Sequence, residues 1–167
     1  MLYAVYHGMS SVEEMRMRID GESVVLYEVI NPVFTVALDN GSYASCRTEP
    51  LCDYEAFSAA VRRGITETKS GERRKVFDDG RTDDFYFSCV PALDFTALEQ
   101  PVSGDDSVMS VPMAVWGKMV NVGTRYEVSL QITAHHALVD GMPLSHVFES
   151  IQKHINEFAE RSVKSHE

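Results

Sequence analysis

Residues 126–151 read YEVSLQITAHHALVDGMPLSHVFESI and contain two different apolar periods. From Val128 to His136 apolar and polar residues alternate, which is typical of a half-buried β-strand. From Pro143 to about Glu160 apolar residues recur every three or four positions, which is typical of an amphipathic helix. Asp140 and Gly141 between the two segments are common turn residues. The stretch therefore predicts a strand, a tight turn and a helix, with two histidines where the strand ends.

Strand alternation places these two histidines on opposite faces. His136 continues the apolar face and His135 the polar face, so we interpret His135 as a surface residue or a supporting neighbour. A histidine at the dry end of a strand is desolvated, and burial favours the neutral imidazole, which can accept a proton. Asp140 meets the positive end of the helix dipole and can order the loop that holds His136. The apolar face is completed by Val128, Leu130, Ile132 and Ala134.

Each of these residues also has a purely structural interpretation. A single histidine on an apolar face is more often a core residue than a catalyst, and an aspartate in this position is more often a cap or turn residue. The pattern of residues 134–141 leaves both interpretations open. The remaining histidines show no spacing typical of metal ligands; they are His7, His146, His154 and His166.

Composition and charge limit the class of protein. With 167 residues, 44% of them hydrophobic, the chain is long enough for one globular domain with a proper core. A net charge of −10 disfavours binding to nucleic acid or to an anionic membrane. We find no apolar stretch near 18 residues and no signal-peptide pattern. The three cysteines lack CxxC spacing, so neither a disulfide framework nor a zinc site is indicated, and we expect a cytoplasmic protein.

Segments with alternating apolar residues recur along the chain and predict mainly strands. A helix is expected over 54–69 with Asp53 as its N-cap, and residues 1–9 look like the end of another helix. The polar stretch 70–84 is expected to form an exposed loop. Strands that outnumber helices predict an α+β fold, with a mixed, mostly antiparallel β-sheet and helices packed on one side. The expected strands are 15–19, 24–29, 33–38, 42–47, 85–90, 93–98, 111–120 and 126–134.

The motif HHxxxDG, after an apolar strand and before an amphipathic helix, resembles the C-terminal motif of the chloramphenicol acetyltransferase family. This family belongs to the CoA-dependent acyltransferases that share HxxxDG. Shorter segments match the family in the same order, and the similarity runs from about Leu2 to the last helix. These segments are Arg16 with Asp20-Gly21 and VVLY, Pro32 to Val36, Ser-Cys-Val-Pro at 88–91 with Phe95-Thr96, and PMAVWGK at 112–118.

The resemblance implies a two-layer sandwich and transfer of an acetyl group from acetyl-CoA to a hydroxyl of a small molecule such as chloramphenicol, with no metal. It implies His136 as the general base and Ser88 as a hydrogen-bond donor to the tetrahedral oxyanion. Asp140 would hold the histidine loop in shape, and Lys118 would contact the cofactor. The resemblance further implies a homotrimer with active sites between subunits, so that His136 is shielded from water in a shared cleft.

Several of these candidate residues, and some of their neighbours, also have a simpler structural interpretation. Ser88 can be a strand-end serine that satisfies the backbone, and Lys118 can be a solvated surface charge. The basic run 73–75 can attract CoA phosphates, but the acidic residues around it favour a solvated loop. Cys89 shows no sign of an activated thiol, and we interpret it as a small buried hydrophobe.

Two departures from the family pattern are expected to matter. The region that precedes Met1 in family members, with a helix, a strand and the arginine that pairs with the motif aspartate, has no counterpart here. We therefore interpret residues 1–167 as a single domain that lacks that helix and strand. Val115 stands where the family has a threonine, and valine forms no hydrogen bond.

These departures support an alternative, a degenerate or truncated family member that acts as a binding or assembly module. A third possibility is the catalytic domain of a lipoyl-linked acyltransferase, which shares HxxxDG. Those enzymes usually have Asp-His-Arg where this chain has His-His-Ala, at residues 135–137.

Overall fold

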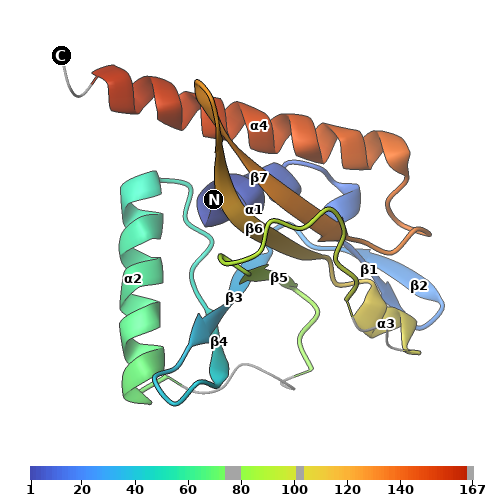
Figure 1. The fold of residues 1–167 in the computed structure, drawn as a ribbon. Coiled ribbons are helices and arrows are strands. Elements are labelled where there is room, and N and C mark those ends of the chain that lie inside the picture. Colours follow the sequence, from blue (N-terminus) through green and yellow to red (C-terminus); the bar gives the residue numbers. More distant parts are fainter. Residues whose placement is uncertain (74–79, 101–103, 165–167) are drawn as a thin grey trace.

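A five-stranded mixed β-sheet forms the centre of the computed structural model, which describes residues 1–73, 80–100 and 104–164 (Figure 1). The strand order is β4-β3-β5-β6-β7. Strand β5 pairs in parallel with β3 and β6, whereas the two outer pairs are antiparallel. The strands are β3 (Asn31–Ala37), β4 (Tyr43–Arg47), β5 (Asp84–Cys89), β6 (Met113–Val122) and β7 (Arg125–Thr133).

The chain outside this sheet forms a hairpin and several helices. Strands β1 (Met17–Asp20) and β2 (Ser23–Leu26) pair antiparallel in a separate two-stranded sheet. A 3₁₀ turn, η1 (Glu14–Arg16), precedes the hairpin and shortens the strand expected over 15–19. The helices are α1 (Leu2–Ser10), α2 (Tyr54–Ser70), α3 (Asp106–Met109) and α4 (Gly141–Lys164).

One face of the sheet carries the core, and helices α1, α2 and α4 pack against that face. Side chains of α1, α2 and α4 join the inward-facing residues of the strands in one buried cluster. Because strand side chains alternate, Phe34 on β3 and Phe87 on β5 face these helices, whereas Thr35 and Ser88 face the opposite side. We call the opposite side the open face. The predicted α+β fold, with a mixed sheet and helices on one side, is therefore confirmed (Figure 1).

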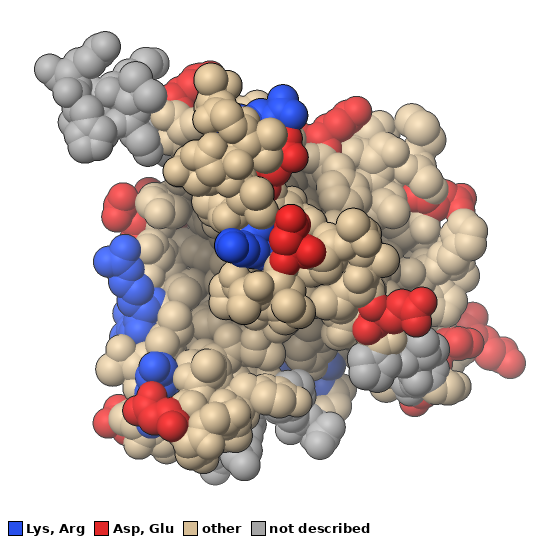
Figure 2. Space-filling model, viewed as in Figure 1, with Lys and Arg blue, Asp and Glu red and all other residues tan. Residues whose placement is uncertain are grey.

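Helix α2 begins and ends where its sequence indicates. The Asp53 side chain accepts a hydrogen bond from the backbone N–H of Ala56 at 2.9 Å, as expected for an N-cap. Gly71 ends the helix with a φ of 79°, a conformation that favours glycine. Figure 2 shows Lys and Arg atoms along α2 and also at the centre and near the top of the view, whereas Asp and Glu atoms are scattered over the whole view. The acidic excess thus forms no single patch on that side.

The chain path differs from the sequence-based expectations in three places. Residues 93–98 form no strand but a loop held on β6, where the N–H of Lys118 donates to the carbonyl of Leu93 at 2.6 Å. Strand β3 begins at Asn31, two residues before the expected start at 33, since a proline is tolerated at the start of a strand. Helix α3, only four residues long, was not predicted.

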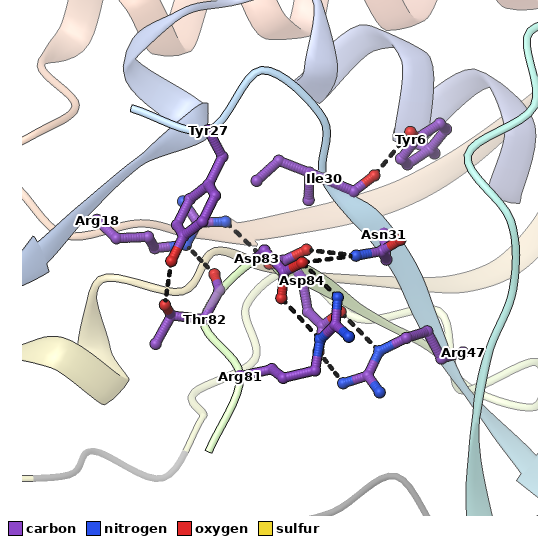
Figure 3. A network of polar contacts seen from close by, with 10 residues as sticks. All are labelled: Tyr6, Arg18, Tyr27, Ile30, Asn31, Arg47, Arg81, Thr82, Asp83 and Asp84. Carbon is purple, nitrogen blue, oxygen red and sulfur yellow. Dashed lines mark hydrogen bonds and ion pairs between the residues drawn. The ribbon is translucent and has the colours of Figure 1, made fainter. Parts of the chain in front are cut away.

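The expected exposed loop over 70–84 is also wrong at its C-terminal end, and residues 74–79 lie outside the described residues. Asp84 is the first residue of β5 and is 0% exposed. Arg47 on β4 reaches it with two hydrogen bonds, from Nε to Oδ1 at 2.9 Å and from Nη2 to Oδ2 at 2.5 Å (Figure 3). Beside this pair, Arg81 forms an ion pair with Asp83. A charge that the sequence places in a loop is therefore enclosed by an arginine 37 residues away.

A second buried arginine connects the hairpin to the sheet. Arg18 is 1% exposed, and its guanidinium donates to four backbone carbonyls, of which those of Thr82 and Asp84 belong to residues drawn in Figure 3. It reaches Thr82 at 2.7 Å, Met15 at 2.8 Å, Met17 at 2.6 Å and Asp84 at 2.9 Å. Burial lowers the pKa of Arg18 to about 10, so the side chain stays charged at pH 7. These bonds join the hairpin β1–β2 to the start of β5.

Helices α1 and α4 lie in close contact at Gly8, and this contact allows a stability test. A Cβ atom at Gly8 would overlap with Cγ1 of Ile151 and lie 2.9 Å from the backbone nitrogen of Ile151. We expect Gly8→Ala to lower the free energy of unfolding by about 1–3 kcal/mol, because the helices must separate. Urea denaturation measures this, with Gly104→Ala as control, since a Cβ there meets nothing within 4 Å. Equal stabilities of the two variants would contradict the close contact.

Candidate active site

The two histidines lie on a tight turn between β7 and α4. Strand β7 ends at Thr133, and the carbonyl of His135 accepts hydrogen bonds from the N–H groups of Leu138 at 2.9 Å and Val139 at 3.0 Å. The N–H of Leu144 donates to the carbonyl of Asp140 at 3.1 Å and so closes the first turn of α4. These backbone hydrogen bonds hold the turn that carries both imidazole rings. The predicted order of strand, turn and helix is confirmed.

His136 lies at the outside of this turn. Its side chain is 88% exposed in the single chain, and its Nδ1 lies 3.2 Å from Oδ1 of Asp140. The expectation that the strand alternation shields this ring from water is wrong for the single chain. The reason is that the strand stops at Thr133, three residues before His136, so the ring no longer follows the apolar face. Asp140, as expected, lies at the start of the helix and faces the histidine loop.

An open groove begins beside the turn. Its volume is about 650 Å³, and it follows the first turn of α4. Glu14, Leu138, Asp140, Gly141, Met142, Pro143 and Ser145 line it. The groove therefore reaches the histidine loop at Leu138 and Asp140, and His136 itself is not among its lining residues.

His135 supports the turn from within. Its Nδ1 accepts a hydrogen bond from the N–H of Ala137 at 3.2 Å, so the neutral ring carries its proton on Nε2. That nitrogen lies 3.6 Å from Oδ1 of Asp106 on α3. The ring thus links the histidine loop to α3, and this contact supports the interpretation of His135 as a supporting neighbour.

Ser88 lies on the open face, in the centre of the sheet. Since β3 and β5 are parallel and Phe34 is paired with Phe87, Thr35 lies beside Ser88, and their hydroxyl oxygens are 3.0 Å apart. On the other side Ser88 is paired with Val115, which is buried. The Ser88 hydroxyl therefore bonds the side chain of Thr35. No local sequence pattern indicates Thr35, because only the parallel pairing of β3 and β5 brings it to Ser88.

The segments around Ser88 and Lys118, separate in sequence, are joined in space. The N–H of Val90 donates to the carbonyl of Trp116 at 2.9 Å, next to the bond from Lys118 to Leu93. Gly117 permits this approach, because a Cβ there would lie 2.5 Å from the carbonyl oxygen of Leu93. A β-bulge between Trp116 and Met119 leaves Lys118 exposed beside the loop.

Comparison with known proteins decides the family. The family model described as chloramphenicol acetyltransferase matches residues 1–152. The chain belongs to the chloramphenicol acetyltransferase family. The family is one of acyltransferases, and the protein is an acyltransferase by this membership.

Individual relatives support the assignment. The protein is 24% identical to the chloramphenicol acetyltransferase of Klebsiella sp over 152 residues, which covers 90% of this chain and 68% of the relative. With that of Vibrio anguillarum the identity is 23% over 163 residues, or 92% and 75% of the two chains. A solved chloramphenicol acetyltransferase superposes with a TM-score of 0.76 and 25% identity, over 91% of this chain and 74% of the other.

The lipoyl-linked enzymes share the fold only. A probable dihydrolipoamide acetyltransferase from Listeria monocytogenes 4b F2365 superposes with a TM-score of 0.67 at 11% identity, over 93% of this chain and 68% of the other.

Two other sequence candidates differ from expectation. Within the basic run, Arg73 is half-buried and pairs with Glu67, with Nη2 and Oε2 2.8 Å apart, whereas Arg74 and Lys75 lie outside the described residues. Cys89 is exposed rather than a small buried hydrophobe, because it is the last residue of β5. Partial burial of its thiol raises the pKa of Cys89, so the thiol is not activated.

The chloramphenicol acetyltransferase fold does not bring all candidate residues together within one chain. Among the described residues the structure records no contact between His136 on its turn and Ser88 on the open face. In the described part of the chain no three His, Cys, Asp or Glu side chains form a group able to hold a metal ion. Likewise, no described helix is both long and apolar enough to span a lipid bilayer.

Proposed function

We propose that the protein is an acetyl-CoA-dependent O-acetyltransferase that acts on a hydroxyl of a small molecule such as chloramphenicol. The observation that carries the proposal is the histidine turn of a family member, with Nδ1 of His136 3.2 Å from Asp140. A carboxylate beside Nδ1 favours the tautomer with its proton on Nδ1 and leaves Nε2 free to accept a proton. With chloramphenicol as acceptor, the reaction would confer resistance to the antibiotic.

The proposed reaction needs no protein nucleophile, because the thioester is already activated. Nε2 of His136 takes the hydroxyl proton of the acceptor while its oxygen attacks the thioester carbonyl carbon. Ser88 donates a hydrogen bond to the oxyanion that forms. When the C–S bond breaks, the CoA sulfur leaves with the proton from His136, and the acetyl ester remains. Lys118, an exposed cation beside the Val90–Phe95 loop, is suited to the phosphates of CoA.

We propose further that His136 works in a site between subunits of a homotrimer. Its exposure in the single chain and the open face around Ser88 support this arrangement, since a neighbouring chain can cover both. Such a cleft would supply the shielding from water that one chain does not provide. Because acetyl-CoA is a metabolite of the cytoplasm, we place the protein there.

The proposal is tested by mixing purified protein with acetyl-CoA and chloramphenicol and following thiol release. We expect release that depends on the acceptor. Absence of release above the level of a His136→Ala variant would exclude this acceptor, and the same result over a panel of small hydroxyl compounds would exclude the reaction.

A binding or assembly module remains the second candidate, favoured by the buried Val115 beside Ser88. Calorimetry with CoA separates the two. CoA binding without turnover supports the module, whereas measurable turnover excludes it.

Ser88 offers a direct test of the oxyanion role. We expect Ser88→Ala to lower kcat about a hundredfold, because one preorganised donor to the oxyanion is lost. Steady-state kinetics of thiol release measure the effect. Ser129→Ala, on the same face of the edge strand β7, serves as control and is expected to stay near the wild-type rate. Equal rates of the two variants would contradict the assignment of Ser88.

A further inference from the structure

The hydroxyl groups of Thr35 and Ser88 form a cross-strand pair on the open face. Their oxygens are 3.0 Å apart, and either atom can be the donor. The parallel register of β3 and β5 fixes this proximity, since the preceding residues Phe34 and Phe87 are paired. Val115, the neighbour of Ser88 on β6, offers no hydrogen-bonding group.

The direction of the hydrogen bond between Thr35 and Ser88 determines whether Ser88 has a proton left to donate. A hydroxyl carries one proton, so one hydrogen bond between Thr35 and Ser88 uses the proton of one partner only. If Ser88 donates to Thr35, its proton is not available to an oxyanion. If Thr35 donates, Ser88 accepts that bond and keeps its own proton free. An accepted hydrogen bond also polarises the O–H group and makes it a stronger donor.

We propose that Thr35 is the positioning residue of Ser88: it donates its hydroxyl proton to Oγ of Ser88 and thereby directs the Ser88 proton towards the oxyanion. The effect of Thr35 on catalysis rests on the proposed acetyl transfer, whereas the hydrogen bond between Thr35 and Ser88 does not depend on it. Threonine suits this task better than serine because branching at Cβ restricts χ1. Thr35 itself touches no reacting atom in this assignment.

A thiol at position 88 tests the donor role without any turnover. In a background with Cys52→Ser and Cys89→Ser, which leaves only the buried Cys46, Ser88→Cys introduces a titratable group beside Thr35. A hydrogen bond donated to a thiolate stabilises the charged form, so adding Thr35→Val should raise the pKa of the new thiol by roughly one unit. The pH dependence of alkylation by iodoacetamide gives this pKa. Thr35→Ser should keep it low, and an unchanged pKa in the valine variant would overturn the proposal.

Kinetics test the consequence for the reaction. Thr35→Val should lower kcat roughly tenfold with little change in KM, whereas Thr35→Ser should retain most of the activity. In a Ser88→Ala background Thr35→Val should have no further effect, because Thr35 acts only through Ser88. If Thr35→Val lowers kcat as much in the Ser88→Ala background as in the wild type, Thr35 has a structural role and the positioning role is refuted. If the wild-type chain shows no transfer at all, the proposed function fails, while the thiol pKa still decides whether Thr35 donates to residue 88.

Discussion

Replacing His136 with alanine is expected to lower kcat about a thousandfold, because the proposed reaction then lacks the group that removes the hydroxyl proton. The free energy of unfolding should change by less than about 0.5 kcal/mol, since the ring is 88% exposed and contacts Asp140, whose side chain is 78% exposed. A large loss of rate with little loss of stability separates a catalytic histidine from a structural one. Thiol-release kinetics and urea denaturation of the same preparation measure both quantities.

His146 provides a matched control, because it is an exposed histidine on α4, the helix that follows the turn. His146→Ala should retain nearly the full rate. A His136→Ala rate within a few-fold of the control would rule out His136 as the general base.

Mixed oligomers test whether two chains share one site. If His136 of one chain works with Ser88 of the next, co-expression of His136→Ala and Ser88→Ala chains should restore about a quarter of the wild-type rate, because a quarter of the interfaces pair two intact residues. Each variant alone should stay near its own low rate. Without any gain on mixing, the two residues would have to act within the same chain.

Local patterns were sufficient to predict much of the fold. The amphipathic period after Pro143 predicted α4, and the Asp53 cap gave the start of α2 within one residue. The motif HHxxxDG predicted the turn and its residues, because the conformation of a turn between a strand and a helix depends on residues that are close in sequence. All these features depend on groups that lie within a few positions of one another in the sequence.

Long-range pairing explains what the sequence did not reveal. The parallel pairing of β3 with β5 connects Thr35 to Ser88 across 53 residues, and no local pattern specifies that partner. For the same reason Asp84 looked like a loop residue, although Arg47 encloses it. The exposure of His136 was missed because alternation predicts a face only as far as the strand continues, and strand ends are poorly marked in sequence.

Replacing Arg47 with methionine is expected to lower the free energy of unfolding by about 3–5 kcal/mol at pH 7, because it leaves the carboxylate of Asp84 buried without its guanidinium. Asp84 is 0% exposed and Arg47 only 20%, and the two are joined through both carboxylate oxygens (Figure 3). Methionine keeps most of the length of the apolar stem, so the loss reports chiefly on the charge. The neighbouring Arg81→Met is the control, since Arg81 is 47% exposed and its bond to Asp83 should contribute less than about 1 kcal/mol.

The pH dependence identifies the cause of the loss. Burial already raises the pKa of Asp84, although the hydrogen bonds and charge of Arg47 lower it in part. Without Arg47 the pKa in the folded state rises further above that of the unfolded chain, near 4. At every pH above the pKa of Asp84 in the unfolded chain, the folded state is then destabilised, because Asp84 is either buried as a bare carboxylate or must take up a proton. This destabilisation vanishes as the pH falls towards about 4. Urea denaturation at pH 7 and near pH 4 measures the difference in the free energy of unfolding between wild type and Arg47→Met. We expect this difference to be smaller near pH 4. Adding Asp84→Asn to Arg47→Met should recover part of the lost stability at pH 7. A difference that is the same at both pH values would mean that Arg47 stabilises the sheet by packing and not by compensating a buried charge.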